Sequence, residues 1–294
     1  MTNRWKTAGS GLAALTLALG LTACNDDKSD GSVDEGADTA GDTATGVEAA
    51  LESLDAAPYG ATMSMDLGGL QYLEGLLEFD DDENGHLETL TYSSVLKELA
   101  PEAFEGQTDD EKAKVMVDTL MTDMVAKTTT VGGEAYHQMK GGMGAILKPK
   151  LGEDFWVHMP ADQVDAGMER LAYQPVDIDV NAEMILGNIT DVEETEAKTF
   201  EGSLETGAVD LVKLFGLYGP QTVGEESIPV TVTMDDEGRF SGLSFSATAV
   251  YDDLGEYPVE YAIDIAEWDG DYSPTAPEGN IIEVEELDEL LLDE

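Results

Sequence analysis

Alternation of apolar and polar residues constrains the fold most strongly, because it dominates both ends of the globular part of this sequence. Residues 59–67 read YGATMSMDL, and residues 257–268 read YPVEYAIDIAEW. A period of two places one face of a strand in a core and the other face in water. Helical patterns fill much of the sequence between these regions. The order of strands, helices and strands predicts an α+β domain, a curved antiparallel sheet (half-barrel) with helices packed over one face.

Turn and helix signals place the elements within this domain. Two acidic turns, DDDENG at 80–85 and DDEG at 235–238, each separate a pair of apolar strands, and the Asn-Gly pair in the first is typical of a hairpin. Residues 108–127, TDDEKAKVMVDTLMTDMVAK, predict one helix with Thr108 as its N-cap. Two further strands, VGGEAYHQM and EDFWVHMP, are predicted on either side of a glycine-rich loop, KGGMGAILKPKLG.

Residues 1–23 have the layout of a secretory signal peptide. Arg4 and Lys6 precede the apolar run GLAALTLALGLTA, which is too short to span a bilayer. Cys24, the only cysteine of the chain, follows immediately. A single cysteine cannot form an intramolecular disulfide, and a free thiol is a liability in an oxidising compartment. We therefore expect Cys24 to be acylated. An ordinary signal peptide that leaves a stray thiol is the alternative.

The four residues LTAC resemble the bacterial lipobox, in which the cysteine receives a diacylglyceryl group and the signal is cleaved just before it. The resemblance implies a lipid anchor on Cys24 at the extracytoplasmic face of the cell membrane, since two or three acyl chains anchor stably. Residues 24–46 are acidic and nearly devoid of large apolar side chains, which predicts a disordered tether. The globular domain is predicted over residues 47–282, and an acidic tail, a short helix or a frayed end, over residues 283–294.

The chain is strongly acidic: 63 Asp and Glu residues against 14 Lys and Arg residues give a formal net charge of −49. This excludes the basic surface that nucleic-acid binding requires. It also argues against adhesion of the folded domain to anionic lipid headgroups. Because the acids are spread along the whole chain, a heavily solvated surface suited to salt is favoured over a surface tuned for cations or a basic partner.

The sequence carries no constellation typical of an enzyme, since it contains no G-x-S-x-G, H-E-x-x-H, C-x-x-C or P-loop motif. We predict a protein without catalytic residues, metal or cofactor. Two metal interpretations are weaker than their structural alternatives. Asp80, Asp82 and Asn84 begin like a calcium loop, but the twelfth place holds Thr91 instead of glutamate, which favours a hairpin turn. Methionines next to histidines, in HQM and VHM, suit cuprous copper, but methionine also fills apolar cores.

Several phrases, in order, carry a family resemblance: LTAC with a polar tether, YGATMSMDLGG, VGGEAYHQM, GEDFWVHMP, VTVTMDDEGRFSGLSFS, and a last strand that ends in Trp268 before SPTAP. This pattern resembles the LppX/LprAFG group of actinobacterial lipoproteins, which shares its half-barrel with the carriers LolA and LolB. The resemblance covers most of residues 55–282. It implies an apolar cavity between sheet and helices that holds acyl chains of lipids or lipoglycans. The heavy acid load and the long helical stretch at 94–127 depart from the family pattern.

The cavity wall is predicted from strand alternation. The side chains that alternation turns toward the helices are Met63, Met65, Leu73, Leu77, Phe245 and Ile263. The opposite face carries acids and a hydroxyl: Ser64, Asp66, Glu74 and Glu78. Small residues at inward positions, such as Gly75 and Ala247, leave room for a ligand or mark tight packing of a helix on the sheet.

Two functions remain open on this reasoning. The leading hypothesis is an exported, membrane-anchored lipoprotein that binds or carries the acyl chain of an amphiphilic lipid or lipoglycan in the cavity. The alternative is a surface lipoprotein that acts as an interaction or sensor-partner module for another envelope protein and has no small-molecule ligand. Co-purifying lipid would distinguish the first from the second.

Overall fold

The structure is a computed structural model. It describes residues 47, 49–54, 58–80, 84–104, 111–152, 154–164, 167–168, 171, 178–209, 214–215, 219–220, 222–252 and 254–287. The predicted signal peptide and tether, and with them Cys24, lie outside the described residues. The predicted helix cap Thr108 and the turn residue Asp82 also lie outside them.

A 13-stranded sheet forms the framework of the described part of the chain. Its strands are β1 (Tyr59–Leu67), β2 (Leu70–Phe79), β3 (Gly85–Thr91), β4 (Met124–Val131), β5 (Glu134–Lys140), β6 (Phe155–Met159), β7 (Ile189–Glu196), β8 (Thr199–Glu205), β9 (Thr222–Val223), β10 (Ser227–Met234), β11 (Phe240–Tyr251), β12 (Gly255–Trp268) and β13 (Asn280–Glu283). They lie in the order β13-β6-β5-β4-β3-β2-β1-β12-β11-β10-β8-β7, and β9 pairs with β11 beside this path. Neighbours are antiparallel except β13, which runs parallel to β6.

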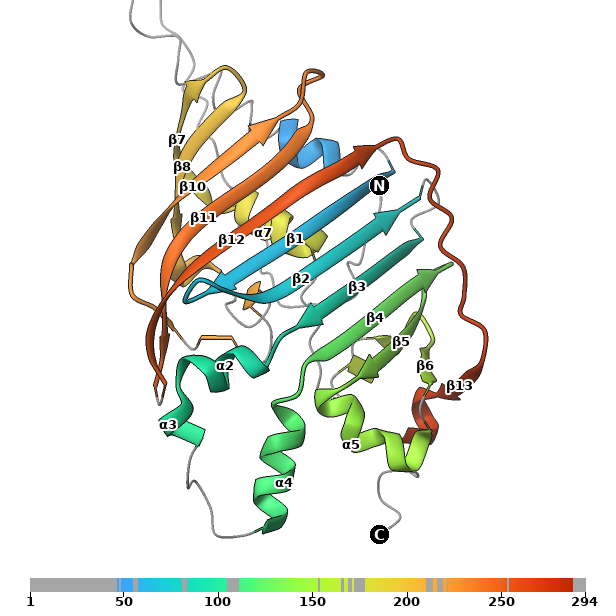
Figure 1. The fold of residues 1–294 in the computed structure, drawn as a ribbon. Helices are drawn as coiled ribbons and strands as arrows, with labels where there is room; N and C mark the ends of the chain where they lie inside the picture. Colours follow the sequence, from blue (N-terminus) through green and yellow to red (C-terminus); the bar gives the residue numbers. More distant parts are fainter. Residues whose placement is uncertain are drawn as a thin grey trace, which may run out of the picture.

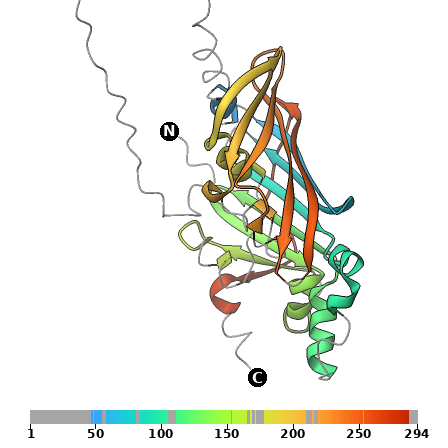
Figure 2. The same ribbon diagram turned by 90° about the vertical axis from the view of Figure 1, so that its left-hand side faces the viewer.

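The helices are short. The described helical segments include residues 47 and 49–54, α2 (Ser94–Leu99), α3 (Pro101–Phe104), α4 (Glu111–Leu120), α5 (Gly142–Leu151), α7 (Ile178–Leu186), the 3₁₀ turn η1 (Thr206–Ala208) and residues 284–287. The 47–54 segment and α7 pack on the same face of the curved sheet, which does not close into a barrel (Figures 1 and 2). The α+β architecture predicted from the sequence is therefore confirmed. Among the described helices, none has the length and apolar character needed to cross a membrane.

Strand alternation divides the sheet into two faces. We call the face of Met63 and Leu77 the inner face, because these side chains are buried under the helices. The outer face carries Ser64, Glu74 and Glu78, which are partly or fully exposed. Both assignments were predicted from the period-two pattern. A register shift between Met65 and Asp66, where β1 pairs with β2, leaves Tyr72 as an extra residue of β2, buried next to Leu73.

Two apolar clusters line the inner face. The larger lies beneath β1–β3, β8 and β10–β12, and includes residues of the 47–54 helix, α2 and α7. The smaller lies beneath β4–β6 and includes residues of α5 and β13. Val284 and Leu287, from the segment predicted as a tail, are buried in the smaller cluster. Between the two clusters the inner face carries the buried polar side chains of Thr89, Thr128 and His137.

Two segments differ from their sequence-based predictions. The helix predicted over residues 108–127 ends at Leu120, and Met124 already begins β4. Met124 is buried at an inward position opposite β3, so long-range pairing overrides the helix preference of the local sequence. The glycine-rich segment predicted as a loop forms α5, because Leu147 and Leu151 bury one side of it in the smaller cluster.

A long connection between β12 and β13, residues 269–279, crosses the sheet near the strand ends, and we call it the strap (Figure 1). Its first residue is fixed by two contacts. The Asp269 N–H donates to the Pro58 carbonyl (2.8 Å), and its carboxylate accepts from Arg239 (2.8 Å). At its far end the Asn280 amide donates to the Leu151 carbonyl (2.9 Å). The strap thus joins the two sides of the sheet across the outer face.

Candidate functional site

The structure gathers the six predicted cavity residues into one continuous apolar patch. They come from β1, β2, β11 and β12, and each is at most 4% exposed. Antiparallel register sets them side by side: Met65 pairs with Leu73, and Met63 pairs with Ile263 on the other side. All six belong to the larger cluster. In the described structure they form the packed interior between sheet and helices.

Helix α7 lies close to this patch. A Cβ added at Gly75 would come within 3.0 Å of Met63 Cε and 3.1 Å of Ile178 Cδ1. Of the two interpretations of Gly75, tight helix packing therefore holds at this position. Ala247, on β11, is also buried at 8% exposure. Gly75 on β2 thus lets α7 approach the sheet closely, and the side chains there are densely packed.

A polar chain runs through the apolar patch. Asn181, a fully buried residue of α7, donates from Nδ2 to the Tyr261 hydroxyl (3.1 Å) and to the Leu214 carbonyl (3.4 Å). The Tyr261 hydroxyl donates in turn to Met63 Sδ (3.1 Å). Among the described residues, none donates a hydrogen bond to the buried Asn181 Oδ1 atom. A buried acceptor of this kind costs stability, so it marks a place where a donor group of a ligand would be stabilised.

The histidines and methionines of the copper interpretation are divided between the two faces of the sheet. Met63 lies in the larger cluster, Met139 lies in the smaller one, and His158 is on the outer face. His137 is fully buried on the inner face, and its Nδ1 lies 2.9 Å from Thr128 Oγ1. Burial lowers the pKa of His137 to about 3, so its imidazole is neutral at physiological pH.

His158 belongs to a separate outer-face cluster. Its ring stacks on Tyr136 with centroids 4.8 Å apart, and its two nitrogens lie 2.7 Å from a Glu283 oxygen and 3.3 Å from a Glu134 oxygen. Because Glu283 lies on β13, this contact fixes the parallel strand to β6. The arrangement explains His158 as a structural residue at the sheet edge.

The acidic hairpin turns are held by their own side chains. Asp80 Oδ1 accepts the Asn84 N–H (2.9 Å), and Asp80 Oδ2 accepts from the Asn84 amide (2.9 Å). In the second turn the Asp235 carboxylate accepts from the backbone N–H groups of Glu237 and Arg239, both at 2.9 Å. Asp80, the first residue of the calcium-loop resemblance, thus acts in turn formation, and Asp82 lies outside the described residues.

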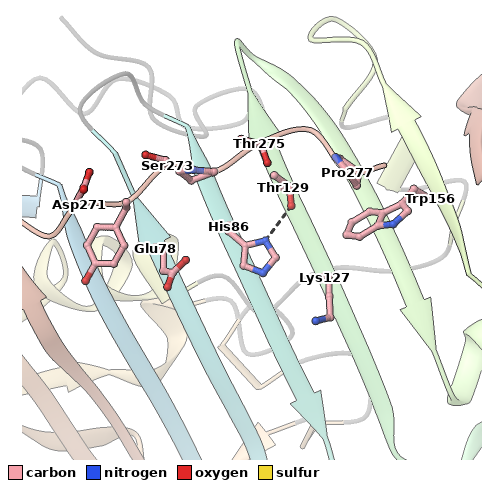
Figure 3. A pocket seen from close by; sticks show the side chains of 11 residues that line it. Glu78, His86, Lys127, Thr129, Trp156, Asp271, Ser273, Thr275 and Pro277 are labelled. Carbon is pink, nitrogen blue, oxygen red and sulfur yellow. Dashed lines mark hydrogen bonds between the residues drawn. The ribbon is translucent and has the colours of Figure 1, made fainter. Parts of the chain in front are cut away.

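A pocket of about 540 Å³ opens on the outer face beneath the strap (Figure 3). Its floor is formed by side chains of β2, β3, β4 and β6, and its roof by strap residues; the lining is Glu78, His86, Lys127, Thr129, Trp156, Asp271, Tyr272, Ser273, Pro274, Thr275 and Pro277. Figure 3 shows His86 at the centre, with Glu78 on one side and Trp156 on the other.

The polar groups of this pocket are held in place by their neighbours. His86 Nδ1 lies 2.9 Å from Thr129 Oγ1, and Lys127 Nζ lies 2.6 Å from a Glu88 oxygen. Burial lowers the pKa of His86 below its ordinary value, an effect that the carboxylate of Glu78 partly opposes. His86 is therefore mostly neutral at pH 7.

The sequence reasoning identified no site at this pocket. Its floor residues are scattered from position 78 to position 156, and its roof comes from a segment more than a hundred residues later. One signal was present: strand alternation puts His86 and Glu78 on the same face as Trp156, opposite the core. The strap that covers them could not be placed from local patterns.

Comparisons with known proteins give no family. No family model and no curated protein matches the chain. Nine chains of solved structures match, among them the complex of Pseudomonas aeruginosa MucA and MucB, with a TM-score of 0.15 and 9% identity over 76% of this chain and 94% of that one. MucB in complex with MucA(peri) gives a TM-score of 0.14 and 8% identity over 75% of this chain and 92% of that one. At such TM-scores these structures carry no argument, and function rests on the residues of this chain.

Proposed function

We propose that the protein is an exported, lipid-anchored binding protein that accommodates the acyl chain of an amphiphile between the inner face of its sheet and the helices over it. The observation that carries the proposal is the continuous apolar patch across β2, β1, β12 and β11. An acyl chain needs such a wall, because burial of apolar surface contributes roughly 25 cal/mol per Å². The N-terminal lipobox resemblance supplies the anchor.

The buried polar chain indicates which polar group the ligand would carry. An amphiphile has one polar end, and a hydroxyl or protonated carboxyl group at that end can donate to the Asn181 Oδ1 atom. The methionine side chains of the patch can adapt to a ligand, since unbranched thioether side chains repack readily around it. Binding requires α7 to move away from β1 and β2, because the six wall residues are themselves packed in the larger cluster beneath α7.

A specific observation favours a second candidate. The close approach of Ile178 to Gly75 indicates a packed core where α7 crosses β2. If the whole inner face remains packed, the protein has no acyl ligand, and its role is that of an interaction or sensor-partner module in the envelope. The heavily acidic surface then becomes its contact surface.

Native mass spectrometry separates the two candidates. The full chain carrying Cys24→Ser, which prevents acylation, should retain a lipid adduct that organic extraction identifies. The same protein should take up a fluorescent fatty acid, and Asn181→Leu should weaken that uptake without abolishing folding. An apoprotein of clean mass that takes up no fatty acid would contradict the binding proposal and favour the interaction module.

A further inference from the structure

The pocket beneath the strap has no part in acyl-chain binding, because it opens on the opposite face of the sheet. We propose that it is a saccharide-binding site that takes a neutral pyranose ring between Trp156 and the His86–Glu78 side of the pocket (Figure 3). Its volume of about 540 Å³ lies within the range of small-molecule sites in proteins.

The pocket has a fixed roof. Tyr272 lies over Gly60 of β1, where the missing side chain leaves room for its ring. Burial raises the pKa of Tyr272, as do the carboxylates of Glu267 and Glu78, and its side chain is hydrogen-bonded to Glu267. Pro274 and Pro277 restrict the backbone between this contact and β13. A roof that is anchored at both ends costs little entropy to order around a ligand.

The charges of the pocket argue against an ionic ligand. Lys127 is already paired with Glu88 at 2.6 Å, and the pocket itself holds the carboxylates of Glu78 and Asp271. An anion would therefore meet net negative charge. For a metal cation, no group of His, Cys, Asp and Glu suited to coordination occurs among the described residues. A neutral polar ligand meets neither difficulty.

The chemistry of the lining suits a sugar. A pyranose ring has an apolar C–H face and a rim of hydroxyl groups that both donate and accept hydrogen bonds. Trp156 offers a flat aromatic surface for the C–H face. Glu78 accepts hydrogen bonds, and neutral His86 together with the hydroxyls of Thr129 and Ser273 can donate or accept them. The same ring chemistry is presented by a free glycan and by the headgroup of a glycolipid.

Saturation-transfer NMR on the full chain carrying Cys24→Ser tests the site. The probes are glucose, mannose, galactose and N-acetylglucosamine with their disaccharides, and separately neutral phosphatidylcholine vesicles with and without a glucosyl diacylglycerol. We expect saturation transfer from the protein to ring protons of at least one free sugar. Otherwise we expect the protein to sediment with the glucosylated vesicles and not with the plain ones. The first result assigns a free glycan, and the second assigns a lipid headgroup.

Variants tie the binding to this pocket. Trp156→Ala and His86→Ala should each weaken binding at least about tenfold, which corresponds to about 1.4 kcal/mol. Trp156→Phe keeps an aromatic face and should retain most of the affinity. Leu76→Ala, an exposed outer-face position outside the pocket, is the matched control and should bind as the unmodified chain does.

Two results would overturn the assignment. One is the absence of saturation transfer to any probe sugar, together with equal amounts of protein sedimenting with the two kinds of vesicle. The other is sugar binding that Trp156→Ala and His86→Ala leave within roughly twofold of the unmodified value. A melting curve of each variant shows that a lost signal comes from the pocket, and Thr129→Val, which preserves side-chain shape, provides a second variant if Trp156→Ala fails to fold.

Discussion

Tyr272 lies so close over Gly60 that a Cβ at position 60 would overlap its phenol ring. This contact joins the strap to the middle of the sheet, because β1 is flanked on both sides by other strands. The absence of a side chain at Gly60 is thus required by a segment more than two hundred residues later in the sequence.

Gly60→Ala should displace Tyr272 and loosen the strap. Overpacking a close contact costs typically about 1–3 kcal/mol, so we expect a lower midpoint of urea unfolding and faster proteolytic cleavage within residues 270–279. Gly207→Ala is the control, since a Cβ there would meet nothing within 4 Å. Equal stability and equal cleavage of the two variants would show that Tyr272 does not hold the strap.

His137 should make stability fall in mild acid. Its pKa in the folded protein is about 3, against 6.5 ordinarily, because burial disfavours the charged imidazole. Below pH 6.5 the unfolded chain binds a proton that the folded chain does not, so stability falls as the pH drops from 6.5 toward 3. The slope contributed by this residue approaches about 1.4 kcal/mol per pH unit.

The His137 effect is isolated by comparison with His137→Gln, which does not titrate. Urea unfolding at about pH 7 and about pH 4.5 should give a larger loss of stability for the unmodified chain than for the variant. Protonation of the many carboxylates changes both proteins alike and cancels in the comparison. Parallel pH profiles would mean that His137 is not buried in its neutral form.

Ala247→Trp distinguishes a ligand cavity from a packed core. In a cavity the added bulk should be tolerated and should reduce uptake of a fluorescent fatty acid. In a packed core it should lower stability by about 1–3 kcal/mol, with no ligand binding to lose. Ser246→Trp, one residue away on the outer face, is the control. A destabilised Ala247→Trp variant, with no fatty-acid uptake by the unmodified chain, would end the carrier proposal in this form.

Cys24→Ser should release the protein from the membrane or block its processing. The reason is chemical, since serine lacks the thiol that receives the diacylglyceryl group at a lipobox. Partitioning between detergent and aqueous phases of Triton X-114 measures the change. If the variant stays in the detergent phase and its signal is still cleaved normally, the anchor lies elsewhere.

The sequence predicts well whatever depends on residues close together in the chain. The alternation in YGATMSMDL placed Met63 and Met65 inward and Ser64 outward, and the structure confirms this. Local patterns mislead where distant strands compete for a segment. Met124 lies within the stretch predicted as a helix, yet pairing with Thr91 of β3 makes it the start of β4.

The saccharide pocket shows the limit of local reasoning more sharply. Glu78, His86 and Thr129 become neighbours only through the register of three strands. Trp156 joins them through β6, and Pro277 covers them through a connection with no periodic pattern. Glu78 and His86 flank the hairpin turn that the sequence predicts, but Thr129, Trp156 and the strap reach them only once the whole sheet has been assembled.

Because β1 pairs with β12, the sheet cannot be completed before the last part of the chain is present. Met63 pairs with Ile263, 200 residues later, so the N-terminal strands keep an open edge until β12 is available. Contacts so far apart in sequence form slowly, and an uncovered edge invites pairing with other chains. A chain synthesised from its N-terminus would therefore not complete its sheet until nearly all of it had been made. Chains that stop short of β12 would lack the strand that pairs with β1 and would leave the edge of β1 open to pairing with other chains.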